Sequence, residues 1–106
     1  MEPNLLEESI AIRKKYSDRI PVLLRTNGNL QLDKKKYLVP LDITLAQFSL
    51  VLRKRTTLKP KEAIFYLIND IAPVSSKTMS ELYSEFMDPS TQLLIISIRK
   101  ENTFGN

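Results

Sequence analysis

The dipeptide Asn27-Gly28 separates two runs of residues that are typical of β-strands, Ile20–Thr26 and Leu30–Val39. Asparagine and glycine both tolerate positive φ, which the central positions of a type I′ turn require. A pair of this kind between two strand-like runs is the strongest short-range signal for a hairpin. We therefore predict that residues 20–39 form two antiparallel strands.

Helix signals precede and follow this hairpin. Apolar residues recur at near-helical spacing within residues 4–15, where acidic residues come early and basic residues late, as the helix dipole favours. The motif Thr44-Leu45-Ala46-Gln47 is a capping box, which predicts a helix that ends near Arg55. The motif Thr78-Met79-Ser80-Glu81 has the same form and predicts a second, shorter helix.

Two further apolar runs predict the remaining strands. Ala63–Ile68 is rich in β-branched and aromatic residues and is interpreted as a buried strand, and Leu93–Ile98 is interpreted as the last strand. A chain of 106 residues is large enough for one hydrophobic core and too small for two. The predicted order of helix, hairpin, helix, strand, short helix and strand is that of an α+β domain of the β-grasp type.

The residues that usually carry catalysis are missing from the sequence. It has no cysteine and no histidine, and it contains no phosphate-binding loop or HExxH motif. We therefore predict that the protein is not an enzyme and holds no metal and no cofactor. No apolar run approaches the roughly 18 residues that a membrane span needs, so we expect a soluble, cytoplasmic chain.

The net charge of +4 favours acidic peptides or anionic membranes as partners. Arg13-Lys14-Lys15 and Arg53-Lys54-Arg55 fall at predicted helix ends, where cations stabilise the helix dipole. An RNA-binding domain that uses the lysine run 34–36 would need exposed aromatic residues between its cations, which the sequence does not provide. We therefore expect no nucleic-acid partner.

The segment Lys34–Pro40 allows two interpretations. Lysine commonly protects an exposed sheet edge, and such an edge can also receive the extended strand of a partner. The period of two places Lys36 and Leu38 on one face and Tyr37 and Val39 on the other, and Pro40 ends the ladder because it has no amide to donate. On these residues alone, a peptide-binding edge and an ordinary core strand are equally supported.

The chain ends with Gly105 and one further residue, Asn106. Glycine near a terminus is common, because the ends of domains are often loose. Alternatively, Gly105 is meant to become the terminus after a cleavage, since a Cα without a side chain leaves the adjoining carbonyl open to enzymes.

Six segments, in the same order, resemble the autophagy ubiquitin-like modifiers, the autophagy-related protein eight family that includes the GABA-receptor-associated and microtubule-associated light-chain types. The segments are Ile12–Val22, Asp33–Pro40, Gln47-Phe48, Leu52–Arg55, Ser80–Tyr83 and Glu101–Gly105. The resemblance covers about residues 8–105. It implies a ubiquitin-like β-grasp core over residues 17–99, an N-terminal helical extension over 1–16 with one helix instead of the usual two, and a conjugation tail over 100–106.

The resemblance also implies what happens at the tail. In such proteins a cysteine protease cuts after the glycine, and activating and conjugating enzymes transfer its carboxyl to the amine of phosphatidylethanolamine. Here Asn106 would be removed, Phe104 would anchor the tail and Gly105 would carry the lipid. A lipid with two acyl chains anchors a soluble domain stably, which implies a cytoplasmic protein with a conjugated pool on autophagosomal membranes.

The resemblance further implies that the edge formed by residues 34–39 receives acidic receptor peptides with an aromatic-x-x-aliphatic motif. The residues implied for the aromatic pocket are Glu8, Ile12, Pro21, Leu23, Lys36, Leu38 and Leu93. Those implied for the aliphatic pocket are Tyr37, Val39, Pro40, Ile43, Phe48 and Val51. Those implied to contact the acidic residues of the motif are Arg19, Lys34, Lys35 and Arg55. The alternative is an adaptor of the same fold that binds peptides and is never conjugated.

Overall fold

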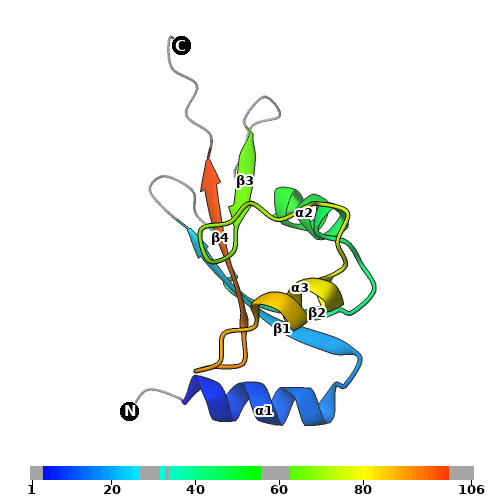
Figure 1. Cartoon of the computed structure of the whole chain (residues 1–106), viewed down its shortest axis with the longest axis vertical. Coiled ribbons are helices and arrows are strands. Elements are labelled where there is room, and N and C mark those ends of the chain that lie inside the picture. Colours follow the sequence, from blue (N-terminus) through cyan, green and yellow to red (C-terminus); the bar gives the residue numbers. More distant parts are fainter. Residues whose placement is uncertain (1–3, 27–31, 33, 56–62, 101–106) are drawn as a thin grey trace.

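The computed structural model describes residues 4–26, 32, 34–55 and 63–100, and the whole chain is drawn in Figure 1. The described elements, in chain order, are α1 (Leu5–Lys15), β1 (Arg19–Thr26), β2 (Lys36–Pro40), α2 (Leu45–Lys54), β3 (Ile64–Leu67), α3 (Met79–Phe86) and β4 (Leu94–Lys100). This is the order that the sequence predicts. The proposed turn at Asn27-Gly28 lies outside the described residues.

The four strands form one mixed sheet in the order β2-β1-β4-β3. β1 and β2 pair antiparallel from Arg19 opposite Pro40 to Leu23 opposite Lys36, which confirms the predicted hairpin pairing. β4 lies beside β1 in parallel and is paired on its other side with antiparallel β3. Each of the two outer strands, β2 and β3, therefore has one neighbour among the described strands.

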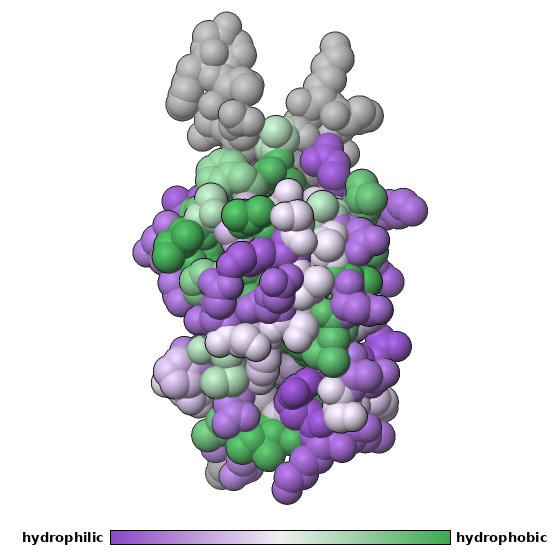
Figure 2. Space-filling model, turned by 45° about the vertical axis from the view of Figure 1, so that its right-hand side comes forward, coloured by the Kyte–Doolittle hydropathy of each residue, from purple (hydrophilic) through white to green (hydrophobic). Residues whose placement is uncertain are grey.

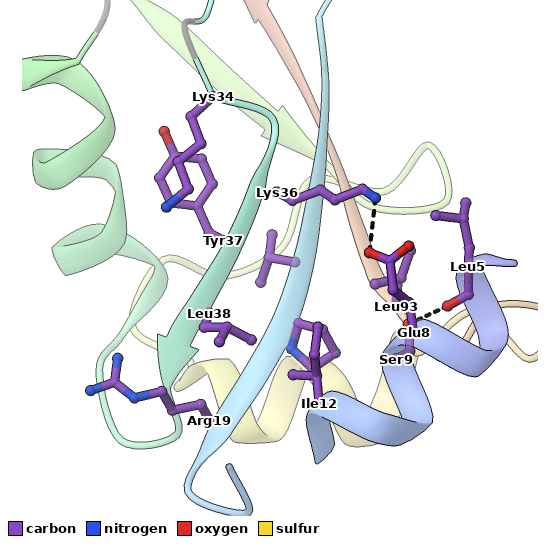
Figure 3. Close-up of a pocket in the computed structure, with 12 residues that line it drawn as sticks. Leu5, Glu8, Ser9, Ile12, Arg19, Lys34, Lys36, Tyr37, Leu38 and Leu93 are labelled. Carbon is purple, nitrogen blue, oxygen red and sulfur yellow. Dashed lines mark hydrogen bonds and ion pairs between the residues drawn. The ribbon is translucent and has the colours of Figure 1, made fainter. Parts of the chain in front are cut away.

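The hydrophobic core lies between one face of the sheet and the helices α2 and α3. The strands contribute alternate residues, such as Ile20, Val22 and Leu24 of β1, because successive strand side chains point to opposite faces. α2 contributes Leu45, Phe48 and Leu52, which recur at helical spacing. α1 contacts β1 from the other side of the sheet, and the close-up in Figure 3 shows α1 and α2 on opposite sides of the hairpin.

Both predicted capping boxes are present. The hydroxyl of Thr44 accepts a hydrogen bond from the amide of Gln47, whose side-chain oxygen accepts one from the amide of Thr44 at 2.9 Å. Thr78 and Glu81 make the same reciprocal pair, again at 2.9 Å for the bond that the Thr78 amide donates. Each box satisfies two amides that a helix start would otherwise leave without partners.

The first amides of α2 and α3 are bound by the segment that precedes the other helix. In α2, the amide of Leu45 donates to the carbonyl oxygen of Lys77 at 3.0 Å. In α3, the amides of Met79 and Ser80 donate to the carbonyl oxygens of Ile43 and Leu41, at 2.8 and 3.0 Å. The two helix starts are thus held together by backbone hydrogen bonds.

Two details of the predicted strands are wrong. The second strand of the hairpin, predicted from Leu30 onward, is described as β2 over Lys36–Pro40. Lys34 and Lys35 are not part of it, although the Leu24 amide donates to the Lys35 carbonyl at 2.8 Å, and residues 30, 31 and 33 lie outside the described residues. The segment interpreted as a buried strand forms the edge strand β3, in which Phe65 is exposed. Its aromatic and β-branched residues indicate a strand correctly, but they do not fix its place in the sheet, which tertiary packing sets.

Among the described residues, no helix is both long and apolar enough to cross a bilayer. Figure 2 shows hydrophobic residues interspersed with hydrophilic ones over one face of the molecule. Exposed hydrophobic side chains include Leu50, Val74 and Ile71. Single exposed residues of this kind are normal on protein surfaces and indicate no site by themselves.

Candidate peptide-binding site

A cavity of about 340 Å³ opens between α1 and the β1–β2 hairpin (Figure 3). α1, β1 and β2 supply most of its walls. Leu93, just before β4, and Lys34, just before β2, supply the rest. Its lining residues are Leu5, Glu8, Ser9, Ile12, Arg19, Pro21, Val22, Lys34, Lys36, Tyr37, Leu38 and Leu93. The cavity is therefore a mainly apolar hollow with charged residues at its border, beside the edge strand of the sheet.

α1 is capped at its start and tied to β1 at its end. At its start, the side-chain oxygen of Asn4 accepts hydrogen bonds from the amides of Leu6 and Glu7, at 3.0 and 3.2 Å. At its end, the guanidinium of Arg13 donates to the carbonyl oxygen of Arg19 in β1 at 2.7 Å. These bonds satisfy free helix amides and tie the helix to the strand that it covers.

Arg13 also links α1 to α3. Its guanidinium lies 5.3 Å from the ring centroid of Tyr83, within the range of a cation–π interaction. The Tyr83 hydroxyl donates to the carbonyl oxygen of Gln92 at 2.7 Å. Burial raises the pKa of Tyr83, and the positive charge of Arg13 opposes this effect, so the ring stays neutral at physiological pH. One arginine thus positions the helix that forms a wall of the cavity.

Charged side chains surround the opening of the cavity. The ammonium of Lys36 lies 3.1 Å from a carboxylate oxygen of Glu8, which joins β2 to α1 across the cavity. Figure 3 shows Lys34 and Arg19 near opposite ends of β2. The ammonium of Lys34 lies 5.0 Å from the ring centroid of Tyr37. Because Arg19, Lys34 and Lys36 outnumber the single carboxylate of Glu8, the border of the cavity carries net positive charge.

On the α2 side of β2, the residues implied for the aliphatic pocket lie on β2, on the turn after it and on α2. Tyr37, Val39 and Phe48 are buried in the core, and the rings of Tyr37 and Phe48 meet edge to face with centroids 5.7 Å apart. Ile43 packs against this core, Pro40 is partly buried, and Val51 is 43% exposed. The buried members thus belong to the core, and Val51 lies at the surface of α2.

Most residues implied for the aromatic pocket lie together. Glu8, Ile12, Pro21, Lys36, Leu38 and Leu93 all line the cavity, and so do Arg19 and Lys34 from the set expected to contact acidic residues. Leu23 lines a neighbouring hollow instead, over one face of β1 and β4. Lys35 and Arg55 are exposed and do not line the cavity. Phe104, Gly105 and Asn106 lie outside the described residues.

Leu5 and Ser9 line the cavity although the sequence did not suggest them. Ser9 is fully buried, and its hydroxyl donates to the carbonyl oxygen of Leu5 at 2.9 Å, which removes the cost of burying a polar group. The spacing of Leu5, Ser9 and Ile12 is four and then three residues, which places them on one face of a helix. That spacing is the signal from which both could have been found.

β2 is an edge strand, so one of its sides has no neighbour among the described strands. β2 is thus an edge strand that also contributes Tyr37 and Val39 to the core, and peptide binding at its edge stays a prediction. The mixed sheet, the helix α2 that packs against it and the short helix α3 before the last strand define the class of the molecule: an α+β domain with the ubiquitin-like, β-grasp fold.

Comparisons with known proteins lead from the class to the family. The family model described as "Autophagy protein Atg8 ubiquitin like" matches residues 4–105. The chain is 44% identical over 102 residues to autophagy-related protein 8 of Coccidioides immitis, covering 93% of this chain and 86% of that protein. It is 45% identical over 101 residues to the same protein of Colletotrichum lindemuthianum, covering 92% and 83%.

Solved structures agree with this assignment. The structure of Trypanosoma brucei ATG8 matches with a TM-score of 0.84 at 35% identity, covering 95% of this chain and 89% of that one. Plasmodium falciparum Atg8, solved in complex with a peptide of Plasmodium falciparum Atg3, matches with a TM-score of 0.75 at 25% identity, covering 92% and 87%. The chain belongs to the Atg8 family of ubiquitin-like autophagy proteins.

Proposed function

We propose that this chain is a ubiquitin-like modifier of autophagy that is cleaved after Gly105, conjugated to phosphatidylethanolamine, and used to recruit receptors to autophagosomal membranes. The observation that carries the proposal is the cavity between α1 and the open edge of β2, in a chain of the Atg8 family. A strand edge, an apolar cavity and nearby cations are the three features that an acidic, extended peptide requires.

In this proposal the receptor peptide adds a strand to β2. Backbone hydrogen bonds to the open edge would supply affinity, and the two pockets would supply specificity. The aromatic residue of the motif enters the cavity that Ile12 and Leu38 line. The aliphatic residue would pack on the other side of β2, toward the exposed Val51 of α2. Acidic residues of the motif meet Arg19 and Lys34, with Lys35 and Arg55 as further contacts.

The conjugation step depends on the tail. Gly105 has no side chain to shield its carbonyl, and Phe104 offers a large apolar group for an enzyme pocket. The partners would be a processing cysteine protease and the activating and conjugating enzymes of the modifier. The Plasmodium relative bound to an Atg3 peptide supports a conjugating enzyme as a partner. Attachment of two acyl chains would convert a cytoplasmic pool into a membrane-bound one.

Replacement of Gly105 by alanine tests the conjugation. The chain is incubated with vesicles that contain phosphatidylethanolamine and with the protease and the activating and conjugating enzymes of its own cell. The intact mass of the product is then measured by mass spectrometry. We expect loss of Asn106 and addition of the lipid to Gly105, and neither in Gly105→Ala. A chain that ends at Gly105 should be conjugated without the protease. An unmodified wild-type chain would favour the adaptor that is never conjugated.

The peptide-binding part is tested with a charge placed in the cavity. Leu38→Asp should weaken the binding of an acidic aromatic-x-x-aliphatic peptide about tenfold or more in calorimetry, because it puts a carboxylate where an apolar ring must pack. The matched control is Val74→Asp, since Val74 is exposed and lies outside the cavity. Equal effects of the two substitutions would contradict this assignment of the site.

A further inference from the structure

A further, smaller hollow lies at the other end of the sheet, where the parallel strands β1 and β4 end side by side. Figure 1 shows β4 running away from α1 toward this end. The hollow has a volume of about 190 Å³ and is lined by Arg25, Thr26, Ser97, Ile98 and Arg99. It shares no residue with the cavity beside β2.

The strand register explains why two arginines meet here. Arg25 of β1 lies opposite Ser97 of β4, and Arg99 follows two residues later on the same face of β4. Arg25 and Arg99 are therefore diagonal neighbours across adjacent strands, close enough for long side chains to approach a common ligand. They are 74 positions apart in the sequence, and only the parallel pairing brings them together.

The chemistry of the lining favours an anion. Two exposed arginines and Ser97 lie on one face of the strands at the hollow, and among the described residues no carboxylate lines it. The acids Asp70 and Asp88 line the adjacent hollow with Arg25, but neither forms an ion pair with it among the described residues. Guanidinium groups bind phosphate oxygens through paired hydrogen bonds, so two of them form a suitable clamp for one phosphate group.

We propose that Arg25 and Arg99 form a phosphate-binding site, and that its ligand is the phosphate of an anionic lipid headgroup. The choice of lipid rests on the proposed function: β4 ends at Lys100, and the five residues 101–105 span at most about 18 Å. A lipid on Gly105 would therefore hold the two arginines close to the headgroups of the same membrane. Such tethering raises the effective concentration of a weak ligand.

The test uses the full, unconjugated chain, so that it does not depend on lipidation. Binding is measured by co-sedimentation with vesicles of phosphatidylcholine that contain about one tenth phosphatidic acid, with pure phosphatidylcholine vesicles as the blank. We expect the double variant Arg25→Gln/Arg99→Gln to bind about 25-fold more weakly, because each arginine near an anionic membrane surface adds to the binding free energy. The circular dichroism spectrum should not change, because both side chains are exposed.

The matched control is Lys14→Gln/Lys15→Gln. This variant changes the net charge by the same amount, from +4 to +2, at exposed positions on α1. We expect it to lose only a few-fold in affinity. Equal losses in the two double variants would overturn the proposal, because general charge attraction would then explain the binding.

A second experiment distinguishes a lipid headgroup from free phosphate as the ligand of the site. Inorganic phosphate is titrated into the labelled chain, and the amide signals of Arg25, Ser97 and Arg99 are followed by NMR. Saturable shifts without selective vesicle binding would support the site and assign it to free phosphate. Absence of shifts together with equal vesicle losses would overturn the site. The Arg25→Gln/Arg99→Gln variant could lose vesicle binding selectively while Gly105 of the wild-type chain is found to be unconjugated. This result would support the phosphate site and overturn only the proposed lipidation.

Discussion

Gln47 and Glu81 occupy the same position in two capping boxes, but only Glu81 can change its charge. The amide of Thr78 donates to the Glu81 carboxylate at 2.9 Å, and the Thr78 hydroxyl lies 3.1 Å from the same oxygen. The hydrogen bond from the Thr78 backbone, and then that from its side chain, lowers the pKa of Glu81 below its ordinary value. The start of α3 is therefore sensitive to acid, whereas the start of α2 is not.

We predict that Glu81→Gln will make the protein less sensitive to acid. A carboxyl whose pKa is lowered in the folded state stabilises the fold above its unfolded pKa of about 4.3, and this contribution is lost as the pH falls through the folded pKa. The free energy of unfolding, measured with guanidinium chloride from pH 7 to pH 3, should fall less in the variant. At pH 7 the two proteins should be similar, since a glutamine already serves in the box of α2.

The other carboxylates titrate in both proteins, so the difference between the two curves isolates Glu81. Parallel curves would mean that the capping carboxylate does not contribute to acid unfolding. The reverse substitution, Gln47→Glu, is a second check, because it should give α2 the acid sensitivity that it lacks.

At the scale of elements, the starts of α2 and α3 form one unit. Thr44 and Thr78 face each other in a backbone bridge, and the first amides of each helix donate to the segment before the other. Local sequence predicts each capping box, because its two partners lie three residues apart. It does not predict the reciprocal bonds, because their partners lie far apart in the chain, 32 residues for Leu45 with Lys77 and 39 for Ser80 with Leu41.

We predict that Thr44→Ala and Thr78→Ala will each lower the free energy of unfolding by about 1 kcal/mol, the usual cost of removing a capping hydroxyl. The double variant should differ from the sum by at least about 0.5 kcal/mol, because the two caps share their surroundings. Chemical denaturation of the four proteins gives this coupling. Strict additivity would show that the two helix starts are energetically independent despite their contacts.

The two edge strands, β2 and β3, show how much of a strand's place in the sheet its own sequence can predict. The lysines of residues 34–36 are typical of a protected edge, and β2 is an edge strand. β3 carries no such signal and is an edge strand as well. Its Tyr66 is partly buried and its hydroxyl lies 2.7 Å from the hydroxyl oxygen of Ser49 in α2, so one face of the strand packs while Phe65 on the other face is exposed.

At the scale of the whole molecule, the net charge of +4 attracts negatively charged partners before they make contact. Cations lie at the border of the cavity beside β2 and, separately, at the end of β1 and β4. Fields of this kind raise association rates with oppositely charged partners and are screened by salt, with a Debye length of about 10 Å at 0.1 M.

We predict that association with an acidic receptor peptide will slow about tenfold or more when salt rises from 20 mM to 500 mM, while dissociation changes much less. Stopped-flow fluorescence separates the two rates. A peptide whose acidic residues are replaced by glutamine is the control, and its association rate should hardly depend on salt. A salt effect confined to dissociation would contradict long-range attraction by the charged border.

The sequence by itself determined the local elements of this protein. Capping residues, apolar periodicity and the strand-like runs around Asn27-Gly28 predict the helices, the hairpin pairing and the order of the elements, because each depends on residues close together in the chain. The alternation in β2 correctly places Tyr37 and Val39 on one face and Leu38 on the other, and the structure shows that the face of Tyr37 and Val39 is the core face.

Tertiary structure alone decided which distant residues meet. The parallel pairing of β1 with β4 made β3 an edge strand and placed Arg25 near Arg99. The packing of α1 against β1 brought Leu5 and Ser9 into the cavity and left Leu23 to the neighbouring hollow. Such contacts depend on how whole faces pack together, and no signal in a single short segment specifies them, because one strand or helix can pack equally well in more than one position.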